Sequence, residues 1–329
     1  MTVLVTGASG FIGRSLVARL RRERDAVRAL VLPGEAAPLD AEIARGDVTR
    51  PETLTPALRR VRTVYHLAAV VGDWGAESLY QAVNVTGTRN LLGAAADAGV
   101  ERVVVVSSVV VYGSQLAREV CDEDLPREHG CGPYSRSKRA QEELALDFHR
   151  FGRVPVTVVR PGNVFGPGSI NWVDMPVAML RAGRLPLIDG GRGDAALTWV
   201  ENLVDLLVLA ARSPAAAGRV YNANDGSGVT WARYFTELAR VAGARPPRLR
   251  MPGSAAMATA VAMEAAWRLT RRRGRPLFTR EAVTLLASGP PVPVRRAAVE
   301  LGFAPAVGFH ETMERLAGAL APGRPERRM

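Results

Sequence analysis

Two side chains that could exchange a proton, Tyr134 and Lys138, stand four residues apart, and Lys138 is the single lysine among 43 basic residues. Residues i and i+4 share one face of an α-helix, so the phenol and the ammonium would lie side by side there. A nearby positive charge lowers the pKa of a tyrosine, which is about 10 when unperturbed. The pair therefore predicts an acid/base group tuned toward neutral pH, although this spacing also occurs by chance on surface helices.

A glycine-rich segment near the start of the chain has the spacing of a phosphate-binding loop. Gly7, Gly10 and Gly13 lie between an apolar run, residues 3–5, and a helical pattern that begins at Phe11. Glycines at such positions permit a tight turn, approach of the backbone to a pyrophosphate, and close packing of helix on strand. The first turn of the helix then offers unpaired N–H groups to the phosphates. We therefore predict a dinucleotide site at this loop.

The end of the second apolar run, residues 31–34, should carry the group that selects between NAD and NADP. An acidic residue there would bind the ribose 2′-hydroxyl and an arginine would bind a 2′-phosphate, but Val-Leu-Pro-Gly offers neither. Arg14 and Arg28 are the cations that could reach a phosphate. Asp47 is placed to hydrogen-bond adenine, or alternatively to form an ordinary strand-end turn. The expected cofactor is NAD or NADP, with NAD slightly favoured.

The first half of the chain alternates short aliphatic runs with helical patterns, which is typical of βαβ units and a parallel sheet. Strands are expected at residues 3–6, 27–32, 43–47, 64–67, 103–107 and 156–160, and helices at 11–24, about 51–60, 79–98 and 134–151. Continuous aliphatic strands of this kind are buried on both faces. The predicted fold class is therefore α/β, with a doubly wound parallel (Rossmann) sheet.

Proline and glycine interrupt this pattern after Arg160. We expect residues 1–168 to form an NAD(P)-binding Rossmann domain and residues 169–321 to form a smaller, mixed substrate lobe. Segment 197–212 is expected to pack back on the first domain. The polar, proline-containing tail, residues 322–329, is expected to be disordered.

Composition excludes several classes of function. The chain is 47% hydrophobic and 23% charged, as in soluble globular proteins. Its net charge is +11, but the arginines are spread along the chain without aromatic interleaving, so a nucleic-acid partner is not expected. Cys121 and Cys131 lack metal-site spacing, which predicts neither a metal nor a disulfide and fits a reducing cytoplasm. Met1 leads into an apolar run without a signal-peptide pattern.

An Ala/Met-rich stretch, residues 255–269, runs into a group of arginines at 271–275. It is too short to span a bilayer, and Glu264 interrupts it. An ordinary helix packed on the smaller lobe is one interpretation. A helix that covers the substrate or touches a membrane surface peripherally through residues 255–275 is the other.

Together these motifs make the chain similar to the extended short-chain dehydrogenase/reductase superfamily, in its NAD-dependent epimerase/dehydratase branch. The matching segments are residues 6–13, 46–48, 66–69, 84–88, 106–113, 134–138, 160–162 and 166–167. Residues 70–75 and the order of segments in the C-terminal half look most like the 3β-hydroxysteroid-dehydrogenase-like group.

The resemblance implies a role for each matching residue. Ser108 would hydrogen-bond the substrate oxygen, with Ser107 as the close alternative. Tyr134 would be the acid/base, and Lys138 would hold the nicotinamide ribose. The residues implied at the cofactor are Gly7, Ser9, Gly10, Phe11, Ile12, Gly13, Asp47, Val48, Leu67, Ala68, Ala69, Asn84, Ser107, Tyr134, Lys138 and Pro161. Those considered for the substrate are Asp73, Trp74, Ser108, Asn163 and Trp172. The family also suggests a homodimer through helices 79–98 and 134–151.

The resemblance implies NAD(P)-dependent hydride transfer to or from a carbonyl or secondary alcohol of a hydrophobic, steroid-like or polyketide-like small molecule. The alternative is a nucleotide-sugar epimerase or dehydratase with the same Ser/Tyr/Lys set. Such enzymes usually place an arginine for the substrate diphosphate near the position of Ala195, where residues 194–197 contain no base, although Arg192 could substitute. A non-catalytic cofactor sensor is a third interpretation, which the intact Ser/Tyr/Lys set disfavours.

Overall fold

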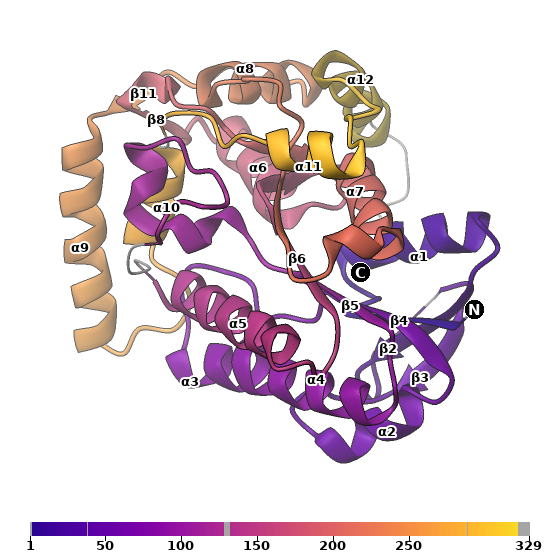
Figure 1. The fold of residues 1–329 in the computed structure, drawn as a ribbon. Helices are drawn as coiled ribbons and strands as arrows, with labels where there is room; N and C mark the ends of the chain where they lie inside the picture. Colours follow the sequence, from indigo (N-terminus) through magenta and orange to yellow (C-terminus); the bar gives the residue numbers. More distant parts are fainter. Residues whose placement is uncertain (1, 38, 128–131, 288, 322–329) are drawn as a thin grey trace.

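A seven-stranded parallel sheet is the centre of the computed structural model, which describes residues 2–37, 39–127, 132–287 and 289–321 (Figure 1). The strands lie in the order β10-β6-β5-β4-β1-β2-β3. Their bounds are β1 Thr2–Thr6, β2 Ala26–Val31, β3 Glu42–Arg45, β4 Val61–His66, β5 Arg102–Val106, β6 Val156–Pro161 and β10 Val220–Ala223. The predicted doubly wound sheet is confirmed. The predicted disordered tail, 322–329, and Cys131 lie outside the described residues.

Helices cover both faces of the sheet because its aliphatic strands are apolar on both sides. On one face α1 Phe11–Arg22 and α7 Val200–Arg212 pack over β1, β2 and β5. On the other face lie α4 Gly87–Asp97 and α5 Pro133–Arg150, with the short α2 Leu54–Ala57. The strand order reverses between β1 and β4. Ligands of such sheets bind at the carboxyl ends of the strands at this point, so the glycine loop after β1 stands where a dinucleotide is expected.

The sheet does not end where the sequence suggested. Its outermost strand, β10, pairs in parallel with β6, with Val220 opposite Val158 and Ala223 opposite Pro161. These residues fall inside the predicted substrate lobe, 169–321, so residue 168 does not mark the last residue of the large unit. A strand of only four residues carries too little periodicity to be recognised in the sequence. Segment 197–212 provides α7, which packs on α1 and on the sheet.

The smaller lobe combines two-stranded sheets with short helices. Its sheets pair β7 Asn163–Phe165 with β9 Leu197–Trp199, and β8 Pro186–Ile188 with β11 Leu249–Met251. Its helices are α6 Met175–Arg181, α8 Trp231–Val241, α9 Gly253–Leu269, α10 Arg280–Leu286, α11 Arg295–Leu301 and α12 Phe309–Leu320. Aromatic side chains fill its core, with ring centroids of Phe165 and Trp199 5.2 Å apart and those of Trp231 and Phe235 5.3 Å apart.

A buried ion pair fixes α5, the helix that carries Tyr134 and Lys138, to the sheet. Arg160 on β6 donates two hydrogen bonds to Glu142 on α5, at 2.8 and 3.2 Å to one carboxylate oxygen, and a third to the other at 3.0 Å. The side chains are 3% and 0% exposed. Removing one partner of such a pair leaves the other charge buried without compensation.

We predict that Glu142→Ala lowers the free energy of unfolding by about 3–5 kcal/mol, because Arg160 loses its buried partner. Glu143→Ala is the matched control, since Glu143 is the next residue, is 52% exposed and pairs with Arg139 on the surface. Its expected effect is about 0–1 kcal/mol. Urea denaturation of both variants measures the difference, and equal small losses would contradict this role of the pair.

Candidate active site

Tyr134 and Ser108 meet at the carboxyl edge of the sheet. Ser108 is the second residue after β5, and Tyr134 lies in the first turn of α5. Both residues are half-buried. The Ser108 hydroxyl lies near the phenol and acts to lower the pKa of Tyr134. Ser108 Oγ also accepts the backbone N–H of Val110 at 3.3 Å, which fixes its direction. A carbonyl oxygen placed between the phenol and the hydroxyl would receive two hydrogen bonds.

The pKa of Tyr134 differs from the sequence-based expectation. Burial of the phenol raises its pKa above the ordinary value, the negative charge of Glu281 raises it further, and the Ser108 hydroxyl opposes the shift. The expectation that Lys138 lowers this pKa is therefore wrong in this structure. Its physical reason is that desolvation disfavours the phenolate, while the Lys138 Nζ, 5.9 Å from the ring centroid, donates to Val106 and Gln141 instead.

Lys138 starts a chain of buried hydrogen bonds. Its Nζ donates to the backbone oxygen of Val106 at 2.8 Å and to Oε1 of Gln141 at 2.9 Å. Gln141 donates through Nε2 to Thr88 Oγ1 at 2.7 Å, and this oxygen lies 2.8 Å from Nε2 of His66. Burial lowers the pKa of Lys138 to about 7, against the opposing charge of Glu142 on the same helix. The lysine is thus held by the sheet rather than by the phenol.

Donor counting fixes the protonation of His66. Thr88 gives its single hydroxyl proton to the backbone oxygen of Asn84 at 2.6 Å, so His66 Nε2 must be the donor to Thr88. His66 Nδ1 then accepts the hydroxyl proton of Thr6 at 2.8 Å. Burial lowers the pKa of His66 to about 3, so the ring stays neutral at physiological pH. This series of hydrogen bonds joins Lys138 to Thr6 at the end of β1, where the glycine loop begins.

The glycine loop fits a dinucleotide. Gly7 has φ +64°, and a Cβ on it would lie 2.8 Å from the backbone nitrogen of Ala68. A Cβ on Gly13 would lie 2.1 Å from the carbonyl oxygen of Gly7. The N-cap of α1 is Gly10, which has no side chain to cap the helix, so the first N–H groups are available to phosphate oxygens. The contact of Gly7 with Ala68 places Leu67, Ala68 and Ala69 beside the loop.

Ser107 adds an independent sign of a ligand at this edge. It is 3% exposed, and its hydroxyl has no hydrogen-bond partner among the residues that the structure describes. A buried hydroxyl without a partner costs about 1–3 kcal/mol. Because Ser107 directly follows β5 and is next to Val106, whose oxygen binds Lys138, a ribose hydroxyl near this lysine would satisfy it.

The other cofactor candidates have defined places. Asp47 follows β3, and its Oδ1 accepts both the N–H and the hydroxyl of Thr49 at 2.8 Å. Val48 is buried against α4, where Gly87 makes room for it. Ser9 lies in the glycine loop, and Phe11 is the first residue of α1. Ile12 packs against the core, and Pro161 is the last residue of β6.

Asn84 lies on a π-helical segment, Gln81–Thr86, between α3 Glu77–Tyr80 and α4. Its Oδ1 accepts the N–H of Val70 at 2.7 Å, and its Nδ2 donates to the oxygen of Val70 at 3.0 Å and to Ser137 Oγ at 2.9 Å. These bonds join the loop after β4 to α5. Both sides of the amide are used, so Asn84 acts here as a tie between the two segments. Single π turns within helices are frequent at functional sites.

Glu35 is a residue that the sequence analysis missed. Residues 32–35 form a β-turn, closed by the Glu35 N–H to the Leu32 oxygen at 3.1 Å, with Gly34 at φ +79°. The turn brings the carboxylate back to the end of β2, where it accepts the hydroxyl of Ser9 at 2.7 Å. Pro-Gly at the centre of a turn is a recognised type II signal and could have located it. Arg28, which the sequence offered as a cation for a 2′-phosphate, donates to Glu42 and to two backbone oxygens.

Besides Ser108, the four residues considered for the substrate divide into two pairs. Asp73 accepts hydrogen bonds from Arg275 and from Thr279 Oγ1, and the guanidinium of Arg268 lies 5.5 Å over the ring of Trp74. This pair therefore joins the loop after β4 to the segment around α9 and α10. Asn163 and Trp172 make their contacts within the smaller lobe. Asn163 donates to the oxygen of Ala195 at 2.6 Å, and Trp172 packs 5.2 Å from Trp231.

The structure brings a further carboxyl group, that of Glu281 on α10, to the start of α5. Glu281 is 6% exposed and accepts a hydrogen bond from Ser135 Oγ at 3.2 Å. Burial raises its pKa to about 7, and the nearby charge of Asp73 adds to the shift. No sequence signal predicts this contact, since 146 positions separate the two residues.

Known proteins resemble this chain over most of its length. The model of the NAD dependent epimerase/dehydratase family matches residues 3–223. A 4-hydroxy-2-methyl-3-oxo-4-farnesyl-3,4-dihydroquinoline-1-oxide ketoreductase of Stigmatella aurantiaca is 31% identical, with 98% of each chain covered. A UDP-glucose 4-epimerase of Vibrio cholerae is 30% identical over 72% of this chain and 75% of its own. The crystal structure of MoeE5 with UDP-glucose and NAD has a TM-score of 0.77 at 29% identity, covering 97% of this chain and 98% of MoeE5.

We predict that Glu35→Ala weakens NADH binding by roughly 10–100-fold. The variant lacks the carboxylate that would accept a hydrogen bond from a ribose hydroxyl, and such a bond contributes about 1.5–3 kcal/mol to binding. NADPH binding should not weaken, since repulsion of the 2′-phosphate is also removed. Glu42→Ala, on the neighbouring strand β3, is the control and should bind both as wild type does. Fluorescence titration gives the four dissociation constants, and an unchanged NADH/NADPH ratio in the Glu35 variant would contradict this role.

Proposed function

Because the chain belongs to the NAD-dependent epimerase/dehydratase family, we propose that it transfers a hydride between the nicotinamide of NAD or NADP and the carbonyl or secondary-alcohol carbon of a hydrophobic, steroid-like or polyketide-like substrate. The observation that carries this is the charge around the substrate region. Ala195 is fully buried, and Arg192 is exposed. The carboxyl of Glu281 stands near the phenol of Tyr134, and that of Asp73 stands near Glu281 and is bound by Arg275. Among the described residues, the position of Ala195 therefore offers no cation to a substrate diphosphate.

The residues of the site divide the chemistry between them. In the reducing direction Ser108 and Tyr134 hydrogen-bond the substrate oxygen, and Tyr134 gives its proton to that oxygen as the carbon is reduced. Bound NADH or NADPH supplies the hydride. The ammonium form of Lys138 stabilises the phenolate that remains. The raised pKa of Tyr134 supports this direction, because it keeps the phenol protonated and ready to donate at neutral pH.

The names of the relatives support both this proposal and its alternative. The Stigmatella ketoreductase and a 2-alkyl-3-oxoalkanoate reductase of Stenotrophomonas maltophilia, 28% identical, favour carbonyl reduction. The Vibrio epimerase and MoeE5 favour a nucleotide-sugar enzyme that uses the same Ser/Tyr/Lys set and keeps NAD bound. A non-catalytic role is disfavoured by the assembled Ser108, Tyr134 and Lys138. Glu35 supports NAD as the preferred cofactor, and a cytoplasmic homodimer through α4 and α5 stays a prediction.

Tyr134→Phe is predicted to lower turnover of a 3-ketosteroid by about 100-fold or more, because the proton donor is lost. NADH binding should remain within about 2-fold of wild type, since the phenyl ring keeps the packing. Oxidation of NADH followed by absorbance measures the first quantity, and fluorescence titration measures the second. Full turnover in the variant would refute the role of Tyr134.

The same assay separates the two candidate functions. Oxidation of NADH by the ketone, without an effect of UDP-glucose, is the expected result for a reductase. Binding of UDP-glucose alone, with one equivalent of NAD retained through purification, would transfer the assignment to the epimerase/dehydratase alternative.

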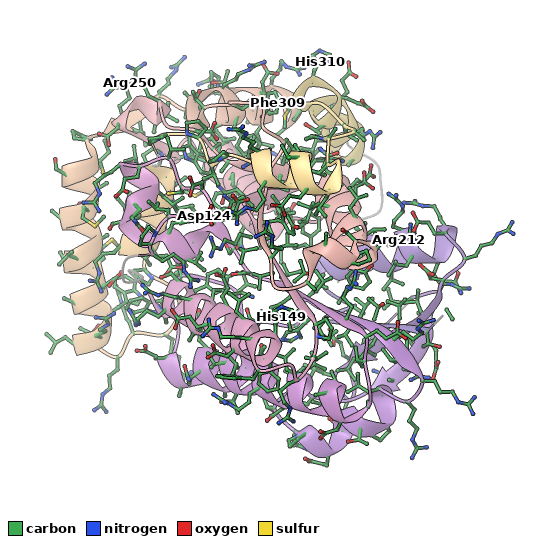
Figure 2. All side chains as sticks on the ribbon, viewed as in Figure 1. Asp124, His149, Arg212, Arg250, Phe309 and His310 are labelled. Atoms are coloured by element: carbon green, nitrogen blue, oxygen red, sulfur yellow. The ribbon has the colours of Figure 1, made fainter. Side chains whose placement is uncertain are left out.

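A peripheral contact with membrane through residues 255–275 is supported by the surface of α9. No helix in the described part of the chain is long and apolar enough to cross a bilayer. The outward face of α9 nevertheless exposes Val261 by 50% and Leu269 by 86%. Exposed arginines flank it, at 271–273 beyond one end and at Arg250 near the other, where the side chain projects from the molecule (Figure 2). Apolar side chains between cations match an anionic lipid surface.

We predict that the protein co-sediments with vesicles containing 30% phosphatidylglycerol and not with pure phosphatidylcholine. Reversal of Arg271, Arg272 and Arg273 to Glu should weaken binding at least about 10-fold, since each basic residue contributes about 1 kcal/mol at such a surface. The same reversal of Arg21, Arg22 and Arg24 on the sheet domain is the control. Equal loss in both triple variants would show non-specific charge attraction instead.

A further inference from the structure

Glu281 is a buried titratable group that the proposed chemistry does not use. It reaches the start of α5 from α10, on the opposite lobe, where its Oε2 lies 3.2 Å from Ser135 Oγ. The approach is close enough that a Cβ on Gly132 would lie 1.8 Å from Glu281 Oε2. Within the residues that the structure describes, no arginine or lysine lies within ion-pair distance of it.

A carboxylate in this position is costly to keep. Burying an ion without a counter-ion costs several kcal/mol even after relaxation, and the nearest carboxylate, Asp73, repels it. A role as a clasp between α10 and α5 needs only a neutral hydrogen-bond acceptor, which an amide side chain would also provide. The choice of a carboxyl group over an amide is therefore unexplained by packing alone.

The surroundings of Glu281 identify what its free lone pairs could bind. With Ser135 and Thr284 it forms the polar part of a small pocket whose apolar walls are Val110, Leu116 and Leu285. The pocket has about 10 Å³ of free space, enough for one group the size of a water molecule. Val110 stands two residues after Ser108, and Ser135 directly follows Tyr134. The pocket is thus lined by close sequence neighbours of the two residues that would hold the reacting carbonyl, and Glu281 is near enough to Tyr134 to raise its pKa.

We propose that Glu281 is a specificity residue of the site, whose carboxylate accepts a hydrogen bond from a hydroxyl group that the substrate carries beside its reacting carbonyl. This inference rests on the proposed carbonyl reduction. A hydroxyl fits the size of the pocket and has one proton to give. An anionic group would be repelled by Glu281 and Asp73, and an ammonium group would leave its other protons against apolar walls.

The proposal makes hydroxyketones better substrates than the matching ketones. Benzoin and deoxybenzoin form a suitable pair, because they differ only in the hydroxyl group next to the carbonyl. Their intrinsic reactivities differ, but that difference cancels when the ratio of their kcat/KM values is compared between wild type and a variant. The quantity to follow is this ratio.

Glu281→Ala is expected to lower kcat/KM for benzoin by roughly 10–100-fold, the range for a lost hydrogen bond to a charged group, while deoxybenzoin changes by less than about 3-fold. Glu281→Gln keeps an acceptor without the charge and should give an intermediate ratio. Glu143→Ala, on the exposed side of α5, is the matched control, since it removes a carboxylate outside the pocket. It should leave the ratio of the two substrates unchanged.

Equal loss for both substrates in Glu281→Ala would overturn the proposal and show that Glu281 acts only on α5 or on Tyr134. If the wild type reduces neither ketone, the proposed reductase function fails separately. The dissociation constants of the two ketones, measured by quenching of bound NADH fluorescence in wild type and Glu281→Ala, then decide the proposal about Glu281. A ratio of dissociation constants that the substitution leaves unchanged would refute it as well.

Discussion

Burial of a single ammonium, that of Lys138, is the constraint on which the site depends. A lysine at the end of a parallel sheet loses its hydration and needs acceptors from several elements at once. The structure supplies the Val106 oxygen from β5 and Gln141 from the same helix, and Gln141 continues through Thr88 and a neutral His66 to β1. These hydrogen bonds fix the positions of α5, the sheet edge and the start of the glycine loop relative to one another.

Tyr134 lies between this lysine and a carboxyl group of opposite effect. Lys138 approaches from within α5, and Glu281 approaches from α10. Burial and the charge of Glu281 both favour the protonated phenol. Tyr134 is therefore a proton donor in this structure rather than a base. A substrate oxygen that becomes more basic as its carbon is reduced would draw that proton, and Lys138 would then stabilise the phenolate that forms.

Local features of the site could be predicted from the sequence, and non-local ones could not. The glycine spacing, the valine-rich strands and the i, i+4 relation of Tyr134 and Lys138 are encoded within a few residues, and the sheet and family they predicted are confirmed. Glu35 was within reach, one residue beyond the segment considered, because the Pro-Gly turn returns the chain to β2. The four-residue strand β10 had too few positions to show a period.

The error about the pKa of Tyr134 has the same origin. Sequence spacing shows that Lys138 is near the phenol, but it does not show how much water remains there, nor that a carboxyl from a position 147 residues away in the chain faces it. Desolvation and a long-range charge determine the direction of the shift, and both come from the way the smaller lobe covers the sheet edge. The lobe that helps to bury the phenol is thus also the source of the carboxyl charge that raises the pKa of this proton donor.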